Sequence, residues 1–305
     1  MAMRRHANRV SKAATPSEST TYKQPSAGYP LKHLELMCST IFPNMLVIIV
    51  ALSAVWFEFT SINFYMRHPE LKVFLKRSFI VWTCLAIRKQ LKYFTIPPRL
   101  ANRRPSLKKK LACHARAIFA AIAANLLGTF IIRPVFGASP QVEETVRLVV
   151  PIYFLVEVVV GYLHFPVPLL KVIVGLCVSW LKAVMIPKLV MEWHNNTSAH
   201  PLGFIAISTA NLYASGIVLR YLTKYNRTQR AVPIPWSEFR YFLQIIGFSA
   251  IIGLIAHVAN HFVLSEQSMM EARVLYFFVT WFMLDKYWKE ALGELLLLTL
   301  PERKK

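Results

Sequence analysis

The chain has 305 residues, of which 55% are hydrophobic and only 17% are charged. A soluble globular domain carries about 25% charged residues, so this composition excludes an ordinary soluble protein, and the apolar content excludes a disordered chain. The 36 Lys and Arg outnumber the 15 Asp and Glu, and the net charge of +21 indicates an anionic partner such as lipid headgroups or nucleic acid. The sequence therefore predicts a membrane protein with basic connections.

The N-terminal segment 1–40 is polar, basic and rich in Ser, Thr and Pro near its start, and we expect a disordered tail there. Its first 15 residues, MAMRRHANRVSKAAT, carry basic residues and no acid. This pattern is also typical of a mitochondrial presequence, and that alternative stays open. No apolar run follows, so the segment is not a secretory signal peptide.

Seven apolar stretches approach the roughly 20 residues that a helix needs to cross a bilayer core. They are 41–66, 111–132, 146–165, 167–187, 201–222, 239–264 and 272–288. Together they predict a transmembrane domain over 41–288, followed by a C-terminal tail, 289–305, whose run 291–298 lies in the membrane interface.

A further apolar stretch, 78–87, is too short to cross a bilayer and has basic residues on both sides. It lies within a basic insertion, 67–110, that carries 13 Lys and Arg. We expect 71–94 to lie flat in the interface as an amphipathic helix. The side chains expected in the acyl boundary are Phe74, Phe79, Ile80, Trp82 and Leu85.

The Lys and Arg distribution predicts the orientation of the seven spans. Segments 67–110 and 220–240 and the C-terminal tail with the adjoining Lys286 share one side and carry 23 Lys and Arg, against 10 on the other side. The positive-inside rule makes the first side cytoplasmic and places the N-terminus in the lumen. Glycosylation acceptor sequences at Asn195 and Asn196 then fall in a lumenal loop, whereas that at Asn226 is cytoplasmic.

Two of the spans contain similar sequences, AIFAAIAANLLGTFIIRP at 117–134 and GFIAISTANLYASGIVLRY at 203–221. Each has Ala-Asn-Leu in the middle, a glycine after it and an arginine near the end; the pairs are Asn125 and Asn211, Gly128 and Gly216, and Arg133 and Arg220. The two spans run in opposite directions. We therefore expect an all-α polytopic protein built from two inverted three-helix repeats plus one helix.

Polar residues at bilayer depth indicate a pore, a partner or a helix interface. Asn125 and Asn211 are the main candidates, because an amide oxygen can bind a passing cation. The other predicted pore-lining residues are small and lie near them: Gly128, Ser208, Thr209, Ser215 and Gly216. Hydrogen bonding between closely packed helices explains the same residues equally well.

The charged residues within the spans indicate structural ion pairs more than ion coordination. Glu157 is expected to pair with Lys171 or Lys182, and Glu58 lies in the first span. His257 and His261 have metal-compatible spacing, but no HExxH motif accompanies them. Cys38, Cys84, Cys113 and Cys177 form no CxxC pair, and we find no GxSxG, Walker or GxGxxG motif. We therefore expect neither an enzyme, a cofactor nor a metal site.

The basic run at 99–110 could bind nucleic acid, but its position between membrane segments favours anionic phospholipid. The lipid-binding residues predicted in this run are Arg103, Arg104, Lys108, Lys109 and Lys110. No nucleic-acid partner is expected.

In the order of these elements the chain resembles the trimeric intracellular cation channels, the TRIC family. The similar pieces are Ile-Phe-Pro at 41–43, AIFAAIAANLLG at 117–128 and IYFLVEVVVGYLHFPVPLL at 152–170. The resemblance covers about 250 residues, 41–288. It implies a homotrimer with one pore per protomer. Two departures are clear. The family's lipid-binding Lys-Glu pair would fall at Gly175-Leu176, and the resemblance makes the nearest basic residues, Lys171 and Lys182, the predicted lipid-binding substitutes. The fifth helix, TANLYASG, lacks the family's arginine.

The resemblance implies a potassium-conducting channel of the endoplasmic reticulum or nuclear envelope, whose counter-ion flux supports calcium release. The alternative location is the mitochondrial inner membrane. The alternative function is a structural or scaffolding membrane protein that does not conduct ions and grips anionic lipid or an acidic partner through residues 67–110.

Overall fold

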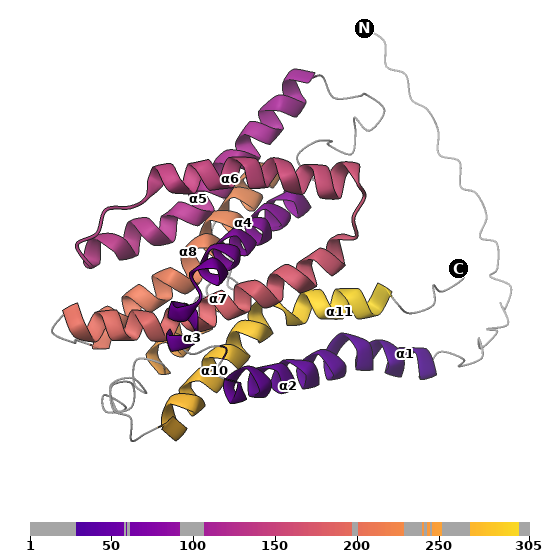
Figure 1. The fold of residues 1–305 in the computed structure, drawn as a ribbon. Coiled ribbons are helices and arrows are strands. Elements are labelled where there is room, and N and C mark those ends of the chain that lie inside the picture. The colour runs from indigo at the N-terminus through magenta and orange to yellow at the C-terminus, as the bar shows by residue number, and fades with distance from the viewer. Residues whose placement is uncertain are drawn as a thin grey trace, which may run out of the picture.

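The computed structural model describes residues 29–57, 59, 62–91, 107–196, 201–228, 240, 243–244, 246–251 and 269–298. This part of the chain is helical and contains no strand, which confirms the predicted all-α class. The helices are α1 (Tyr29–Leu36), the π-helix η1 (Met37–Ile41), α2 (Phe42–Trp56), α3 (Ile62–Arg67), α4 (Pro69–Leu91), α5 (Leu107–Val135), α6 (Val142–Glu157), the π-helix η3 (Val158–Tyr162), α7 (Val167–Asn196), α8 (Pro201–Thr228), α10 (Met269–Tyr287) and α11 (Lys289–Leu298) (Figure 1).

Four helical segments of the described chain are long and apolar enough to cross a membrane: His33–Trp56, Lys110–Val135, Val142–Tyr162 and Val167–Ile186. The predicted membrane class is thus confirmed at the level of length and composition. The predicted spans 201–222 and 272–288 are helical in α8 and α10 but are not among these four. The predicted span 239–264 lies mostly outside the described residues.

The first span begins earlier and ends earlier than predicted. It covers His33–Trp56 instead of 41–66, because the helix stops at Phe57, whose backbone leaves the helical region at φ −86° and ψ 6°. Residues 29–40, placed in the disordered tail, are helical. Of the predicted tail, only 1–28 lies outside the described residues.

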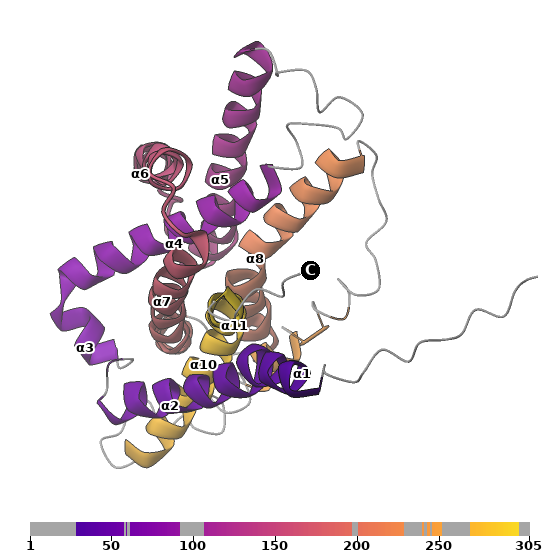
Figure 2. The ribbon, with the colours of Figure 1, turned by 90° about the vertical axis from the view of Figure 1, so that its right-hand side faces the viewer.

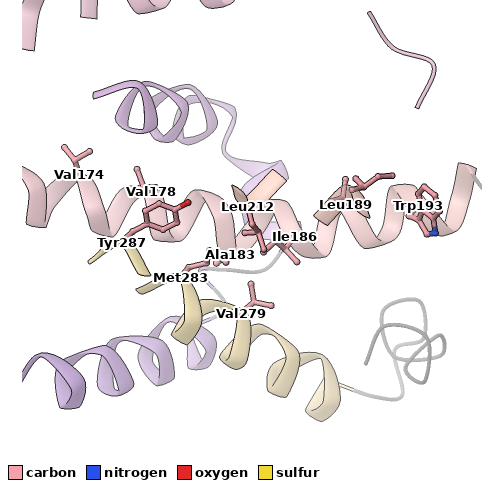
Figure 3. Close-up of a cluster of buried hydrophobic side chains, with 11 residues drawn as sticks. Val174, Val178, Ala183, Ile186, Leu189, Trp193, Leu212, Val279, Met283 and Tyr287 are labelled. Carbon is pink, nitrogen blue, oxygen red and sulfur yellow. The ribbon is translucent and has the colours of Figure 1, made fainter. Parts of the chain in front are cut away.

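Helix α7 is the centre of the bundle, and α4, α8, α10 and α11 all pack against it (Figures 1 and 2). Figure 3 shows Val279, Met283 and Tyr287 of α10 facing the α7 side of a buried apolar cluster. The Ser179 hydroxyl donates to the carbonyl oxygens of Gly175, 2.8 Å away, and Met283, 3.0 Å away. The second hydrogen bond links α7 to α10.

Helices α5 and α8 carry the similar Ala-Asn-Leu sequences, and they form the most extensive helix pair in the described part of the chain. Small side chains allow the close approach: Ala121 and Ala124 are buried, and a Cβ on Gly128 would lie 3.8 Å from the Ala214 Cβ. The two predicted repeat counterparts are therefore direct neighbours, while the repeat itself stays a prediction.

Helix α4 lies inside the bundle, where it packs against α5, α6 and α7 and passes between α6 and α7 in both views (Figures 1 and 2). Ile80 and Leu85 are only 5% and 2% exposed, so they cannot enter an acyl boundary. This contradicts the prediction that Ile80 and Leu85 enter the acyl boundary, whereas 92–94 of the predicted interfacial helix lie outside the described residues. Of the five side chains expected in lipid, only Phe74 is largely exposed.

The short helix α3 anchors the start of α4 through Tyr65, which is buried beside Leu75, Leu181 and Val184. This burial raises the pKa of the Tyr65 phenol to about 12, so the side chain stays neutral. At the other end of the chain, α11 buries Ala291, Leu292 and Gly293. The first part of the run 291–298 therefore packs on protein, whereas Leu297 and Leu298 are exposed.

Candidate functional site

The side chain of Lys182 lies in the core between α7 and α8 and is only 5% exposed. Its Nζ donates to the side-chain Oδ1 of Asn211, 2.9 Å away, and to the backbone oxygen of Asn211, 3.2 Å away. It also lies 4.9 Å from the centre of the Phe79 ring on α4. Asn211 is 8% exposed, so a single cation is held by two neutral oxygens and a ring face in a buried site.

A second lysine binds the next residue of α8. The Nζ of Lys286 on α10 donates to the backbone oxygen of Leu212, 2.9 Å away, and lies 5.0 Å from the Tyr287 ring centre. Consecutive carbonyl groups of α8 thus accept hydrogen bonds from lysines on two different helices. No carboxylate of the described residues lies within ion-pair distance of Lys182, so its ammonium group is hydrogen-bonded by neutral oxygens without a counter-charge there.

The other predicted pore residues of α8 cluster around Asn211 in sequence and are buried or half-buried. The Ser208 hydroxyl donates to the Ile205 carbonyl oxygen, 3.2 Å away. The Thr209 hydroxyl is buried and makes no hydrogen bond within the described part of the molecule. Ser215 and Gly216 are half-buried.

The predicted pore residues of α5 have local roles. The Asn125 Nδ2 donates to the Ala121 carbonyl oxygen of its own helix, 2.8 Å away. Gly128 faces α8 and allows its close packing. Neither residue contacts Lys182, so the structure brings together Asn211 and Lys182 but not the Asn125–Asn211 pair suggested by the repeat.

The predicted lipid-binding lysines of α7 have protein partners instead. The Lys171 Nζ lies 2.6 Å from the Glu294 Oε2 of α11. Because Lys182 is buried against Asn211, it cannot reach a lipid headgroup, and we correct that prediction. Lys108 and Lys110 are exposed at the start of α5, and the Lys109 backbone is helical; Arg103 and Arg104 lie outside the described residues.

Glu157 pairs with a residue that sequence reasoning did not propose. Its Oε2 lies 3.4 Å from the Arg88 Nη1 of α4, and both side chains are about one-fifth exposed, at 22% and 21%. A Cβ on Gly161, in the π-helix η3, would lie 3.2 Å from the Arg88 Nη2. The glycine therefore makes room for the guanidinium, and neither Lys171 nor Lys182 pairs with Glu157.

No group of three or more His, Cys, Asp or Glu side chains in the described residues could hold a metal ion. The predicted pair His257 and His261 and the acid Glu58 lie outside these residues. The sequence spacing along one helix could indicate a polar residue such as Asn211, but it does not show which residues of other helices are in contact. Sequence analysis therefore missed three residues that pair across helices: Arg88, Lys286 and Glu294.

Together, the fold and the site define a helical membrane protein with a buried cation held by amide and carbonyl oxygens. Comparisons with protein-family models, curated proteins and solved structures found no match to this chain. The resemblance to the TRIC family consequently stays a prediction from the sequence.

Proposed function

We propose that the protein is a channel for monovalent cations, chiefly potassium, in an intracellular membrane. The observation that carries this proposal is the pair of Asn211 oxygens that bind the Lys182 ammonium. An ammonium group and a potassium ion carry the same single charge, and carbonyl oxygens replace the hydration shell of potassium in channels. The Lys182 side chain that binds these oxygens is covalently attached to α7 and cannot move through a pore. In this proposal the structure is therefore the closed state of the channel.

Three further parts of the proposal are taken from the TRIC resemblance. They are the role of counter-ion flux in calcium release, the homotrimer and the location in the endoplasmic reticulum. The seven-span arrangement of two inverted repeats plus one helix belongs to this proposal as well. The oxygen site is independent of that resemblance, because it depends only on the approach of α7 to α8.

Single-channel recording in planar bilayers with a potassium gradient tests the proposal. Lys182→Met removes the tethered cation and keeps an unbranched side chain, so we expect a higher open probability than in the wild-type protein. Asn211→Leu removes the amide oxygen, and we expect a lower potassium current. Lys171→Met is the matched control on the same helix, since Lys171 pairs with α11 outside this site.

Potassium current from the wild-type protein, changed in opposite directions by the two site variants and unchanged by Lys171→Met, supports the channel. Silence of the wild-type and Lys182→Met proteins, with normal assembly on size-exclusion chromatography, contradicts it. Asn125→Leu separates the two asparagines, because Asn125 bonds within its own helix and should alter the current less than Asn211→Leu.

A structural membrane protein is the second candidate, and the packing of α5 favours it. Asn125 is hydrogen-bonded within α5, and Gly128 sits against Ala214, as in a packed helix interface. This candidate binds anionic lipid or an acidic partner through 67–110 and conducts no ions. Bilayer silence with retained assembly supports it over the channel.

A further inference from the structure

The start of α4 lies at one end of the central helices. Lys72 is within electrostatic range of Lys188 and Glu192, near the end of α7, and of Glu144, in the first turn of α6. Leu75 belongs to the same buried cluster as Val184. We name this end of the bundle face A.

The end of α4 lies at the opposite end of the same helices. Arg88 pairs with Glu157, the last residue of α6, and its guanidinium lies against Gly161 in the following π-helix. The Trp82 ring lies beside Gly175, in the first third of α7. Helix α4 therefore runs parallel to α6 and antiparallel to α7. We name the end of the bundle that it reaches face B.

The neighbouring helices fit the same two faces. Helix α5 begins near face B, because His114 in its second turn lies 2.9 Å from the Tyr153 hydroxyl in the last part of α6. Gly293 in α11 lies against the Ser39 carbonyl before α2, and the adjacent Glu294 binds Lys171 near the start of α7. The start of the first span and the end of the last helix thus both lie at face B.

Figure 1 shows this arrangement directly. The connection from α6 to α7, the helices α1 and α11 and the end of α4 lie toward the right. The connection from α5 to α6, the end of α7 and the start of α8 lie toward the left.

We infer that α4 carries the chain across the bilayer inside the helix bundle, so that the two ends of segment 67–110 lie on opposite sides of the membrane. Residues 29–43, 107–110 and 287–298 then share face B, and face B is the cytosolic one. This crossing is an eighth, so it replaces the seven-span arrangement that the TRIC resemblance implies and moves the N-terminus from the lumen to the cytosol. It does not depend on whether the protein conducts ions.

The charge distribution supports the assignment. Arg116, Lys171 and Lys182 lie within spans in both arrangements and are left out of the count. Every other Lys and Arg can be counted with the face to which its segment is attached. Face B then receives 25, in 1–32, 88–110, 220–240 and 286–305, whereas face A receives 8, at Arg67, Lys72, Lys76, Arg77, Arg133, Arg147, Lys188 and Arg273. The asymmetry exceeds the 23 against 10 of the flat-helix arrangement, and the positive-inside rule places face B in the cytosol.

The polar composition of α4 is compatible with this crossing because protein covers it. A hydropathy threshold assumes that a helix faces lipid, whereas α4 faces α5, α6 and α7 along its buried side. Lys76 and Arg77 are exposed and lie within two and a half turns of its start, from where long side chains reach the interface. Arg88 is compensated by Glu157.

Cysteine accessibility in sealed membrane vesicles with the cytosolic side outward tests the inference on the full chain. Arg67→Cys and Lys108→Cys are made in a background in which Cys38, Cys113 and Cys177 are replaced by Ser; Cys84 is retained because it is buried. Ala138→Cys reports face A and His164→Cys reports face B, and both arrangements place these two references on opposite sides. The probe is a membrane-impermeant maleimide, applied before and after detergent.

We expect Lys108→Cys to label with His164→Cys before detergent, and Arg67→Cys to label with Ala138→Cys only after it. Labelling of Arg67→Cys together with His164→Cys overturns the crossing. An N-terminal epitope tag gives a second measurement that needs no cysteine. Antibody access after selective permeabilisation of the plasma membrane supports the inference, and access only after all membranes are opened contradicts it.

Discussion

Gly175 of α7 sits where two helices approach each other more closely than any side chain allows. A Cβ at this position would lie 2.7 Å from the Tyr287 carbonyl oxygen, which is backbone and cannot rotate away. The backbones of α7 and α10 are therefore in close contact at this position.

We expect Gly175→Ala to destabilise the protein by about 1–3 kcal/mol, the cost of overpacking a well-packed interior. Gly128→Ala is the control, since its Cβ would meet only Ala214 at 3.8 Å, an ordinary contact. The measurement is the thermal unfolding midpoint of both variants in the same detergent. Equal midpoints for the two variants would show that α7 and α10 are not in backbone contact.

The ion pair of Arg88 and Glu157 provides a second prediction. Removal of either charge leaves the other partly buried, so we expect Arg88→Gln or Glu157→Gln alone to cost about 1–3 kcal/mol, less than the roughly 3–5 kcal/mol of a fully buried pair. The double variant should cost less than the sum of the single variants. Unfolding in detergent measures all three, and additive costs would mean that the two groups do not interact.

At the scale of single residues, the sequence indicated the hydrogen-bond acceptor, Asn211, but not the lysine that binds it. Asn211 was selected because its amide oxygen can bind a passing cation. Lys182 was assigned to lipid because it is one of the basic residues nearest to the position of the TRIC family's Lys-Glu pair. It lies in a different helix from Asn211, 29 positions away, and the sequence spacing does not indicate that α7 and α8 meet there. Glu157 was likewise predicted to be paired, but its partner, Arg88, lies on a helix that was placed outside the bundle.

Among the elements, α11 illustrates how a short helix is held by one charge pair and an apolar face. Lys171 and Glu294 are 2.6 Å apart and are 14% and 34% exposed, so their pair is more shielded than that of Lys289 and Asp285, which are 31% and 44% exposed. Glu294→Gln should therefore loosen α11 from α7 by about 1 kcal/mol, at the upper end for partly exposed pairs.

Hydrogen exchange measured by mass spectrometry checks this prediction, because a loss of about 1 kcal/mol raises local opening about fivefold. The control is Lys289→Gln, whose pair is exposed and lies within one turn of chain. Equal exchange in α11 for both variants would assign its docking to the apolar side chains alone.

The failure of the α4 prediction has a physical cause at this scale. Ten apolar residues between basic flanks cannot cross lipid, and this argument from hydropathy holds for a helix that lipid surrounds. It does not hold for α4, where Ile80, Cys84 and Leu85 are covered by α5 and α6. The long apolar helices α5, α6 and α7 were predicted with nearly the observed bounds because their own composition decides their environment.

For the whole molecule, the all-α class and the membrane-spanning composition were predictable, because both depend on local sequence. The arrangement of the helices was not, since it depends on contacts such as Gly203 against Trp193, where a Cβ would lie 2.5 Å from the ring. The membrane topology was likewise not predictable, because it also depends on contacts between helices. A single helix that is placed on the surface instead of inside reverses the side of the N-terminus.

The acceptor sites at the end of α7 give a prediction for the complete protein. Both arrangements of α4 place Asn195 and Asn196 on the non-cytosolic side, so we expect glycosylation there if the protein enters the secretory pathway. A mobility shift on treatment with an endoglycosidase, abolished by Asn195→Gln and Asn196→Gln together and unaffected by Asn226→Gln, confirms it. A shift that depends on Asn226 would invert the orientation.

The burial of α4 also constrains the order in which this protein can be made. A helix that is stable only between other helices gains little by partitioning into lipid when it leaves the ribosome. The guanidinium of Arg88 must wait for Glu157, about 70 residues further along the chain, before its charge is compensated. From the inferred crossing we therefore expect the insertion of α4 to be a late event in biogenesis, coupled to the emergence of α6 and α7.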